Sequence, residues 1–395
     1  MKPRELVLLR CPACRGRLDC ASVQVRTETG EVRDGVLACS GCGERYPVLD
    51  WIARLVPPQL LRETERSVLQ RDTGPAPQIV PPEEPDADEL RVTLDEKARA
   101  KIFHAGLPPG LEAQAQRDYE YRARHTEEKM KFVRTAAPLL RGELNTIVDV
   151  GGGQGGTLSA FRAAYQPGHA FLVDLDPEWL EVARLRDRAT EVVRGDATRL
   201  PFADRSIDLL ITTATLEHIP DWRGALREFL RVARQGLVCY GPNGSFPYDF
   251  GHVGAPFVTW LPKPAAARVA AAYHRLRGTG RTLDTIRHQL ESTFYIPRAQ
   301  AMRELERSGA EATNVFREFL EESARDEYHL HGAWVLRVLR EHPRLRRAFS
   351  GVLTAIGMEP NVYIFFRAPV CAEAVEVKTA AGAAPARPAD AADQR

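Results

Sequence analysis

The sequence predicts an α/β protein with a doubly wound, seven-stranded sheet, helical insertions and a small module that precedes the sheet. Three observations lead to this prediction. Short apolar segments alternate with amphipathic helical segments, a glycine-rich loop follows the first apolar segment, and two C-x-x-C pairs lie near the N-terminus. Strands that alternate with helices pair in parallel and carry helices on both faces. A chain of 395 residues is long enough for two or three domains.

Seven segments are predicted to be strands because they are short, apolar and bounded by turn residues. They are 146–150, 170–174, 191–194, 207–212, 237–240, 312–319 and 362–366. Helical patterns such as 177–187 and 222–233 lie between most of them. A long segment separates the last two strands, which predicts an insertion within the final hairpin.

Composition divides the chain into four parts. They are a cysteine-bearing module (1–56), a linker (57–90), a large domain (91–370) and a tail (371–395). The linker holds seven prolines and is expected to be semi-extended, and the Ala/Pro-rich tail is expected to be disordered. Within the large domain we expect insertions at about 241–296 and 321–357.

The overall composition is that of a globular protein, with 44% hydrophobic and 27% charged residues and a net charge of +1. A net charge this small gives no general electrostatic attraction to nucleic acid or to an anionic membrane. No apolar run reaches membrane-spanning length, and no signal-peptide pattern opens the chain. We therefore expect a cytoplasmic protein without a membrane span, in which the cysteines stay reduced.

The loop at 149–156, Asp-Val-Gly-Gly-Gly-Gln-Gly-Gly, follows the first strand and opens a helix. Glycines at such a position allow the backbone to approach a ligand closely. The pattern fits D-x-G-x-G-x-G, the loop that binds S-adenosylmethionine, through Gly151, Gly153 and Gly155. It also fits the dinucleotide pattern G-x-G-x-x-G. The loop alone therefore leaves both classes of cofactor open.

Residues further along the chain distinguish the two cofactor classes. The second strand ends at Asp174, a carboxylate that a dehydrogenase would also use for the ribose. A dehydrogenase would not need the segments that follow, Arg-Gly-Asp196-Ala197, Leu-Pro-Phe202, Ser-Ile-Asp208 and Leu-Glu217-His218. This order resembles class I S-adenosylmethionine-dependent methyltransferases of the ubiquinone/menaquinone C-methyltransferase type, over about residues 146–240. The resemblance implies a Rossmann-like fold and S-adenosylmethionine as the cofactor.

The same resemblance implies which residues bind the cofactor. They are Asp149, Gly151, Gly153, Gly155, Asp174, Asp196 and Ala197. The glycines would pass under the methionine part, with Asp149 anchoring the loop. Asp174 would take the ribose hydroxyls, and Asp196 with the Ala197 amide would contact the adenine. Asp176 is interpreted as the N-cap of the next helix.

Methyl transfer from a sulfonium depends mainly on alignment, and a base is needed only if the acceptor must lose a proton. Candidates near the methyl group are Glu217 and His218 after the fourth strand, and Asp249 and His252 after the fifth. His252 is the preferred base, because polar loop residues serve sites more often than cores. His218 has a competing interpretation as a packed imidazole that caps the next helix.

Two departures from similar families narrow the chemistry. The D/N-P-P-Y loop of many amino-methylating enzymes is absent after the fourth strand, which disfavours an exocyclic nitrogen as acceptor. Quinone O-methyltransferases carry an E-x-x-E-H metal motif, but the position of its first acid is Ala214 here. This difference argues against a catalytic divalent metal.

Four cysteines form the two C-x-x-C pairs: Cys11, Cys14, Cys39 and Cys42. The spacing lets both thiolates of a pair face one tetrahedral ion, and four sulfurs complete the coordination of a structural Zn²⁺. Residues 6–58 resemble the small zinc-ribbon activator subunit of tRNA and rRNA methyltransferases, which stabilises a catalytic partner and performs no chemistry. Asp34-Gly35 is expected to form a hairpin turn between the pairs.

The segment after the fifth strand is where a doubly wound sheet binds its substrate. Residues 241–300 are rich in aromatics and hold seven basic against three acidic side chains. We therefore expect a bulky, anionic acceptor, which is a small molecule, a glycan or a lipid-linked intermediate, methylated at oxygen or carbon. The helical pattern at 114–136 is expected to cover the cofactor from the other side.

Other functions stay open at this point. A tRNA or rRNA methyltransferase is favoured by the ribbon and disfavoured by charge, since residues 1–56 carry nine basic and seven acidic side chains and phosphate binding needs a basic surplus. A non-catalytic S-adenosylmethionine-binding protein is a third possibility, and a nicotinamide oxidoreductase is the least favoured. The oligomeric state is left open.

Overall fold

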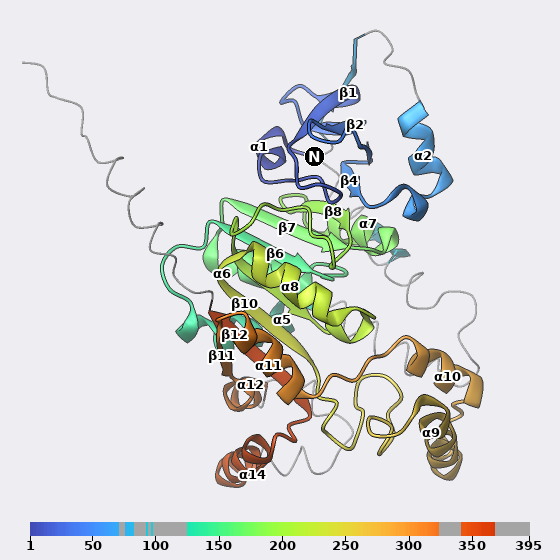
Figure 1. Ribbon diagram of the computed structural model, residues 1–395, viewed down its shortest axis with the longest axis vertical. Helices are drawn as coiled ribbons and strands as arrows, with labels where there is room; N and C mark the ends of the chain where they lie inside the picture. Colours follow the sequence, from blue (N-terminus) through green and yellow to red (C-terminus); the bar gives the residue numbers. More distant parts are fainter. Residues whose placement is uncertain (71–75, 83–91, 94–95, 98–124, 324–340, 368–395) are drawn as a thin grey trace, which may run out of the picture.

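The computed structural model (Figure 1) describes residues 1–70, 76–82, 92–93, 96–97, 125–323 and 341–367. Seven of the described strands form the doubly wound sheet, in the order β11-β12-β10-β9-β6-β7-β8. Their bounds are β6 Thr146–Val150, β7 His169–Asp174, β8 Glu191–Gly195, β9 Ile207–Thr213, β10 Ala233–Pro242, β11 Glu311–Asn314 and β12 Asn361–Arg367. β6 to β10 are parallel, β12 is antiparallel to β10, and β11 is antiparallel to β12. The predicted α/β fold class is confirmed.

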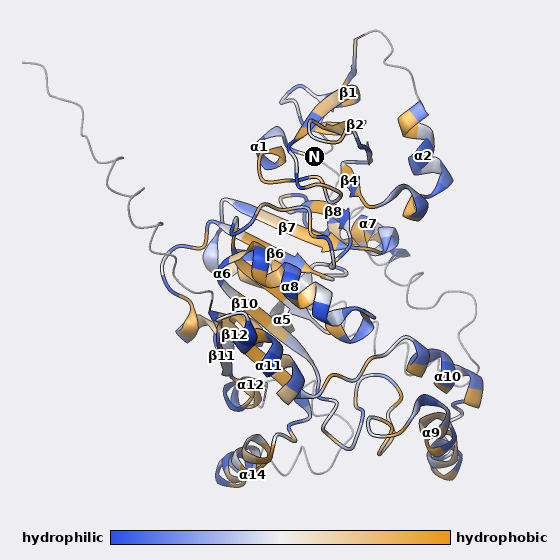
Figure 2. Ribbon diagram, viewed as in Figure 1, coloured by the Kyte–Doolittle hydropathy of each residue, from blue (hydrophilic) through white to orange (hydrophobic). Residues whose placement is uncertain are grey.

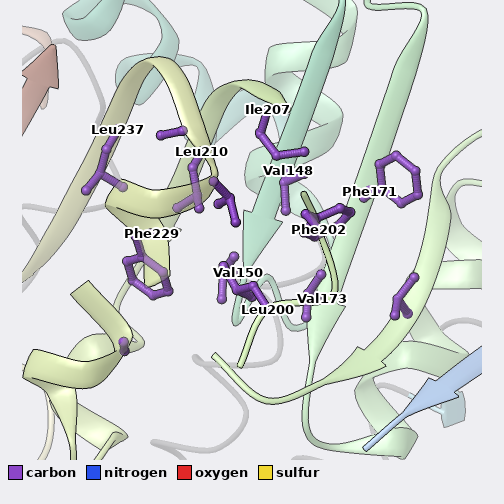
Figure 3. Packing of buried hydrophobic residues seen from close by; sticks show 14 of the residues in the cluster. Val148, Val150, Phe171, Val173, Leu200, Phe202, Ile207, Leu210, Phe229 and Leu237 are labelled. Carbon is purple, nitrogen blue, oxygen red and sulfur yellow. The ribbon is translucent and has the colours of Figure 1, made fainter. Parts of the chain in front are cut away.

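Helices cover both faces of this sheet. One face carries α5 (His125–Ala136), α6 (Gly156–Tyr165) and α7 (Pro177–Arg186), and the other carries α8 (Trp222–Val232) and α11 (Arg298–Arg307). Successive residues of β6 alternate between the two cores, as the pleat of a strand requires. Ile147 belongs to the core that contains Phe161 of α6. Val148 and Val150 belong to the core that contains Phe229 of α8 (Figure 3). Strands covered on both faces are expected to be apolar, and β7 and β10 are mostly orange, the colour of hydrophobic residues, in Figure 2.

Two aspartates fix the ends of these elements. Asp176 accepts a hydrogen bond from the Glu178 N–H at 3.0 Å and caps α7, as predicted. The fully buried Asp208 accepts hydrogen bonds from the N–H groups of Asn145 and Thr146, both at 3.0 Å. Asp208 therefore ties the start of β9 to the start of β6.

The predicted strand at 312–319 is wrong in its second half. β11 ends at Asn314, and α12 (Phe316–Ser323) begins two residues later. The Asn314 side chain accepts a hydrogen bond from the Phe316 N–H at 3.1 Å, which satisfies a helix N-terminal donor. Phe316 and Phe319 are then buried at helical spacing.

The N-terminal module is a four-stranded meander whose last strand continues the main sheet. Its elements are α1 Pro3–Leu6, β1 Leu18–Thr27, β2 Val32–Cys39, β3 Arg45–Leu49 and β4 Ile52–Leu55. β4 pairs in parallel with β8, with Ala53 opposite Val193 and Leu55 opposite Gly195. One sheet of twelve strands therefore runs through both parts of the chain (Figure 1). The sequence did not predict this union.

The hairpin turn expected at Asp34-Gly35 is wrong. Both residues lie inside β2, and the turn between β1 and β2 falls at 28–31, where Gly30 has φ of 84°. Asp34 instead accepts a hydrogen bond from the Asp50 N–H at 3.0 Å. Gly35 is needed for close strand approach, since a Cβ there would lie 2.6 Å from the Ser22 carbonyl oxygen.

Part of the expected linker at 57–90 is folded. It contains η1 (Pro58–Leu60), α2 (Glu63–Gln70) and β5 (Gln78–Val80), which pairs with β1. The α2 helix buries Val68 and Glu65, and the Glu65 carboxylate lies 3.0 Å from Arg54 Nε on β4 and 2.6 Å from Arg194 Nη1 on β8. These buried contacts order a proline-rich segment. Residues 71–75, 83–90 and the predicted tail at 371–395 lie outside the described residues.

The two predicted insertions contribute helices. In the first, α9 (Lys263–Arg277) and α10 (Leu283–Glu291) form a small core of their own around Val253 and Ile286. In the second, α12 and α14 (Pro343–Ile356) flank residues 324–340, which lie outside the described part. Among the described helices, none has the length and apolar character needed to cross a membrane.

Candidate active site and cysteine cluster

A cavity of about 1080 Å³ lies at the carboxyl ends of β6 to β10. Open parallel sheets bind ligands at this edge, beside the point where the strand order reverses, which here lies between β6 and β9. Five of the predicted cofactor residues line the cavity: Gly151, Gly153, Asp174, Asp196 and Ala197. Asp149 lies fully buried outside the lining, and Gly155 is the N-cap residue of α6.

Two positions of the loop need glycine. Gly151 has φ of 69°, and a Cβ there would lie 2.0 Å from the Thr215 side chain. Gly153 has φ of 52°, and no heavy atom of the described residues lies within 4 Å of its Cβ position. The backbone at Gly153 is therefore open to a ligand in the cavity.

The loop and Asp174 hold each other in place. Asp174 Oδ2 accepts a hydrogen bond from the Gly153 N–H at 3.0 Å, and Oδ1 accepts one from the Asp176 N–H at 2.9 Å. Burial raises the pKa of Asp174, while these N–H groups act in the opposite direction. Each carboxylate oxygen can accept a second hydrogen bond, which suits the two hydroxyls of a ribose.

The buried Asp149 side chain lies against the backbone of the glycine-rich loop. A Cβ on Gly152 would lie 2.9 Å from the Asp149 carboxyl carbon, so the two are in close contact. Among the described residues, neither Asp149 oxygen has a hydrogen-bond partner, and burial raises the pKa of this carboxyl to about 7. A buried carboxylate without a partner is costly. The site therefore fits a cofactor that brings a positive charge and hydrogen-bond donors.

Several cavity residues were not foreseen from the sequence. They are Lys129, Lys131, Phe132, Trp179, Thr215, Tyr240 and Phe319. Phe132 of α5 packs its ring 5.1 Å from that of Tyr240 and 5.0 Å from that of Phe319, measured between centroids. These residues match no motif, and they meet because α5, α7 and α12 pack around the carboxyl ends of the strands. The predicted helix at 114–136 lies in the described part from residue 125 onward, as α5.

The four predicted catalytic residues lie in one group at the ends of β9 and β10. His218 lines the cavity. His252 Nε2 is 4.0 Å from Glu217 Oε1, and His252 Nδ1 is 3.3 Å from Asp249 Oδ1. Tyr295 donates a hydrogen bond from its hydroxyl to Asp249 Oδ2 at 3.0 Å.

Burial and hydrogen bonding set the charges in this group. Burial raises the pKa of Glu217 to about 7. Burial also opposes ionisation of Asp249, but hydrogen bonds from His252 and the Val253 N–H outweigh it and hold that pKa at about 2. The Asp249 carboxylate in turn raises the pKa of His252 despite burial. Burial lowers the pKa of His218.

The competing interpretation of His218 as a helix cap is wrong. The cap of α8 is Asp221, whose side chain accepts a hydrogen bond from the Gly224 N–H at 2.9 Å. His218 instead shares a hydrogen bond between its Nδ1 and the Ser292 carbonyl oxygen, at 3.0 Å. His218 therefore joins the end of β9 to the chain that follows α10.

Some basic residues of 241–300 are bound to other parts of the chain, whereas others are exposed to solvent. Arg281 donates hydrogen bonds to the carbonyl oxygens of His252 and Val253, both at 2.7 Å, and so holds the loop that carries His252. Arg298 forms an ion pair with the buried Glu359 at 2.5 Å. Others are exposed on α9, including Arg275 and Arg277. Three aromatic side chains of the same region are about half exposed, Phe250, Phe257 and Trp260.

The four paired cysteines converge at one point of the N-terminal module. Cys11 Sγ is 3.7 Å from Cys42 Sγ, Cys14 Sγ is 3.4 Å from Cys39 Sγ, and all four sulfurs lie within 4.8 Å of one another. Sulfurs around tetrahedral Zn²⁺ lie about 3.8 Å apart, because each Zn–S bond is about 2.3 Å. The cluster therefore has the ligands and the spacing of a structural zinc site.

The surroundings of the cysteines also fit a metal. Backbone N–H groups of Gly16 and Gly41 donate to Cys14 Sγ at 3.4 Å and to Cys39 Sγ at 3.3 Å. A Cβ on Gly16 would lie 2.9 Å from Cys39 Sγ, so glycine lets the chain pass close to the sulfurs. Burial opposes ionisation of Cys39, but hydrogen bonds from the Cys42 and Gly41 N–H groups, together with the Cys14 and Cys42 thiols, outweigh it and lower the pKa of Cys39 to about 7.

Two family models match the chain. Residues 148–240 match a methyltransferase domain, and residues 2–50 match the Trm112p-like proteins. Both resemblances stated from the sequence are thereby confirmed.

Curated relatives match the same central segment. A demethylmenaquinone methyltransferase from Roseiflexus sp. is 40% identical over 93 residues, which are 23% of this chain and 39% of that protein. The chloroplastic 2-methyl-6-phytyl-1,4-hydroquinone methyltransferase 2 of rice is 34% identical over 94 residues, 23% of this chain and 27% of that protein. The chain thus spans less than half the length of these relatives.

Solved structures show a distant likeness. A complex between the Haloferax volcanii Trm112 methyltransferase activator and a methyltransferase has 17% identity and a TM-score of 0.41, covering 67% of this chain and 100% of that one. The plantazolicin methyltransferase BamL has 9% identity and a TM-score of 0.39, covering 72% of this chain and 99% of that one.

Proposed function

We propose that this chain is an S-adenosylmethionine-dependent methyltransferase with a structural zinc ribbon. The observation that carries the proposal is the cavity at the carboxyl ends of the parallel strands. There the open backbone of Gly153, the carboxylate of Asp174 and the tip of β8 at Asp196 meet. They do so within the segment that matches a methyltransferase domain.

In this proposal the cofactor supplies a methyl group on a positively charged sulfur, and the chain aligns it. Asp174 accepts hydrogen bonds from the ribose hydroxyls. Asp196 and the Ala197 amide hold the adenine, and the buried carboxylate of Asp149 compensates positive charge at the methionine end. The aromatic side chains of Phe132 and Tyr240 exclude water near the sulfur, which favours transfer to the acceptor over hydrolysis.

The acceptor that we propose is a ring-bearing molecule with an acidic group, methylated at oxygen or carbon, and a lipid-linked intermediate is the preferred class. Half-exposed aromatic rings follow β10, where substrates of this fold bind, and they offer apolar contact area. Exposed arginines on α9 supply forks for a carboxylate or phosphate. The names of the Roseiflexus and rice relatives refer to quinone and hydroquinone rings, which agrees with this choice.

We further propose that Glu217, His218, Asp249 and His252 prepare the acceptor for attack on the methyl group. His218 lines the cavity, its ring centroid is 5.1 Å from that of His252, and His252 Nε2 is the nitrogen not bonded to Asp249. When no metal ion is bound beside it, this nitrogen takes the acceptor proton, so that His252 acts as the base preferred from the sequence.

Calorimetry on the purified chain tests the cofactor. S-adenosylmethionine should bind and NADH should not. Asp174→Ala should weaken binding by about 1–3 kcal/mol, the cost of losing good hydrogen bonds to a ligand. Asp204→Ala, at an exposed aspartate outside the cavity, is the matched control and should bind normally. NADH binding, or unchanged affinity in Asp174→Ala, would contradict the assignment.

Turnover separates an enzyme from a non-catalytic cofactor-binding protein. We expect transfer of a labelled methyl group to short-chain demethylquinols that carry an acidic substituent. An RNA methyltransferase is the second candidate, because residues 2–50 match the Trm112p-like proteins. Methylation of bulk tRNA or rRNA by the purified chain, with no transfer to any quinol, would favour that candidate.

A further inference from the structure

Three side chains from two separate segments point their ligand atoms at one place. Glu217 and His218 lie in η3 (Leu216–His218) directly after β9, and His252 lies in the loop after β10. One ligand atom from each of the three lies within 4.8 Å of the others. The rings of His218 and His252 have centroids 5.1 Å apart and are nearly perpendicular, at 76°. The two imidazoles therefore do not stack.

Each histidine is oriented by an oxygen on its other side. His218 Nδ1 lies 3.0 Å from the Ser292 carbonyl oxygen, and His252 Nδ1 lies 3.3 Å from Asp249 Oδ1. A carbonyl oxygen can only accept, so His218 carries its proton on Nδ1. The Asp249 carboxylate also receives the N–H groups of Gly251 and His252, at 3.1 Å and 3.2 Å, and so acts as the acceptor toward His252. In the neutral imidazoles both Nε2 atoms are therefore left with a lone pair, as in metal-binding histidines.

The carboxylate of Glu217 supplies the third donor. Its side chain is 3% exposed, and among the described residues its Oε2 has no hydrogen-bond partner. A buried carboxylate oxygen without a partner is costly, and a bound cation would offset that cost. Gly241 of β10 leaves room beside it, since a Cβ there would lie 3.2 Å from Oε2.

We propose that Glu217, His218 and His252 bind one divalent transition-metal ion, through a carboxylate oxygen and the two Nε2 atoms. Two imidazoles with one carboxylate favour Zn²⁺, Mn²⁺ or Fe²⁺ over Ca²⁺ and Mg²⁺. Three protein ligands leave further coordination positions open. Because His218 lines the cavity, the open positions lie beside the cofactor pocket. Asp249 is then a positioning residue that holds His252.

The role of the ion, unlike its binding, rests on the proposed methyltransferase function. An acceptor hydroxyl bound to the ion loses its proton to solvent more easily. The oxygen lone pair then forms the bond to the methyl carbon while the carbon–sulfur pair goes to sulfur, which gives a methyl ether and S-adenosylhomocysteine. In the metal-bound protein His252 is a ligand rather than the base.

Manganese is the probe that separates this site from the cysteine cluster, because four thiolates select Zn²⁺ over Mn²⁺. Titration of the full, zinc-loaded chain with Mn²⁺, followed by electron paramagnetic resonance, should show one bound ion per chain. Glu217→Gln and His252→Ala should each weaken binding by more than tenfold. Asp249→Asn should weaken it by about 10- to 100-fold. His288→Ala, at an exposed histidine of α10, is the matched control and should bind normally.

Circular dichroism and the zinc content of each variant establish that it is folded. Absence of a bound Mn²⁺ in the folded wild type, confirmed by a Zn²⁺ titration with no second site, would overturn the proposal in favour of a His252–Glu217 ion pair. Binding that survives both Glu217→Gln and His252→Ala would also overturn it. Calorimetry with S-adenosylmethionine is an independent readout. Cofactor binding and methyl transfer in metal-free protein would support the proposed function and contradict a role of the ion in it. Mn²⁺ binding without cofactor binding would support the metal site and contradict the proposed function.

Discussion

Glu65→Gln is expected to lower the free energy of unfolding by about 3–5 kcal/mol, the cost of removing one partner from a buried ion pair. Glu65 is buried between Arg54 and Arg194, whose side chains are 4% and 8% exposed. The Glu65 carboxylate also accepts a hydrogen bond from the Arg62 N–H at 2.8 Å. Burial lowers the pKa of Arg54 and Glu65 counteracts this, so the Glu65 charge is what makes the buried guanidinium tolerable.

The glutamine has nearly the same shape, so the loss would come from charge and from an amide N–H₂ that faces guanidinium donors. Equilibrium urea unfolding followed by circular dichroism measures the change. Glu63→Gln, at an exposed position of the same helix, is the control and should stay within about 0.5 kcal/mol of wild type. Limited proteolysis should cut first near α2, because Glu65 joins α2 to β4 and β8. A loss below about 1 kcal/mol in Glu65→Gln, with wild-type proteolysis, would refute this reasoning.

Three further predictions follow from the site. Cys39→Ser should release the proposed zinc ion and lower the melting temperature, as measured by metal analysis and calorimetry. Cys20→Ser, at an exposed cysteine outside the cluster, is the control and should keep both. Retention of zinc in Cys39→Ser would contradict the assignment. Burial raises the pKa of Asp149 to about 7, so the folded state holds this proton more tightly than the unfolded state, and its contribution to stability falls as pH rises from about 4 to 7. Asp149→Asn should therefore become more stable than wild type as the pH rises over that range, and urea unfolding at pH 8 should show a gain of about 2–4 kcal/mol. The same variant should bind the cofactor more weakly. A stability difference that does not depend on pH would refute the raised pKa of Asp149. Replacing Arg275 and Arg277 together by alanine should raise the acceptor KM several-fold and leave cofactor affinity unchanged. If neither these substitutions nor ionic strength changes turnover, an acidic acceptor is excluded.

The central sheet could be predicted because its signals are local. β6 and β7 are short apolar runs that end at a glycine loop and at Asp174, and both the strand and the site residue follow from the same few positions. The strand predicted at 312–319 failed because Asn314 ends it, and a side-chain cap is invisible to an apolar pattern. The linker prediction missed α2 for a similar reason, since the partners of Glu65 lie on two distant strands.

The contacts within the candidate catalytic group could not be predicted from the sequence, because they join residues of separate segments. The sequence argued against a metal because Ala214 replaces the first acid of a linear motif. The structure brings His252 to Glu217 and His218 from the loop after the neighbouring strand. The sequence placed Glu217 and His218 after the fourth strand and His252 after the fifth, but it did not give the directions of their side chains. Phe132 lies in the helical pattern at 114–136, which was expected to cover the cofactor, but that pattern does not single out one side chain of the helix.

The pairing of β4 with β8 has a consequence for the solubility of the chain. Without the N-terminal module, β8 would be an open strand edge, which invites pairing with other molecules. Here the covering strand belongs to the same chain, so its local concentration is fixed by the polypeptide and does not fall on dilution. In the proposed zinc-bound form, the four cysteines stabilise the module that supplies this covering strand. We therefore expect that zinc starvation first causes aggregation of the protein through the exposed edge of β8. The cofactor-binding residues should lose their arrangement only later.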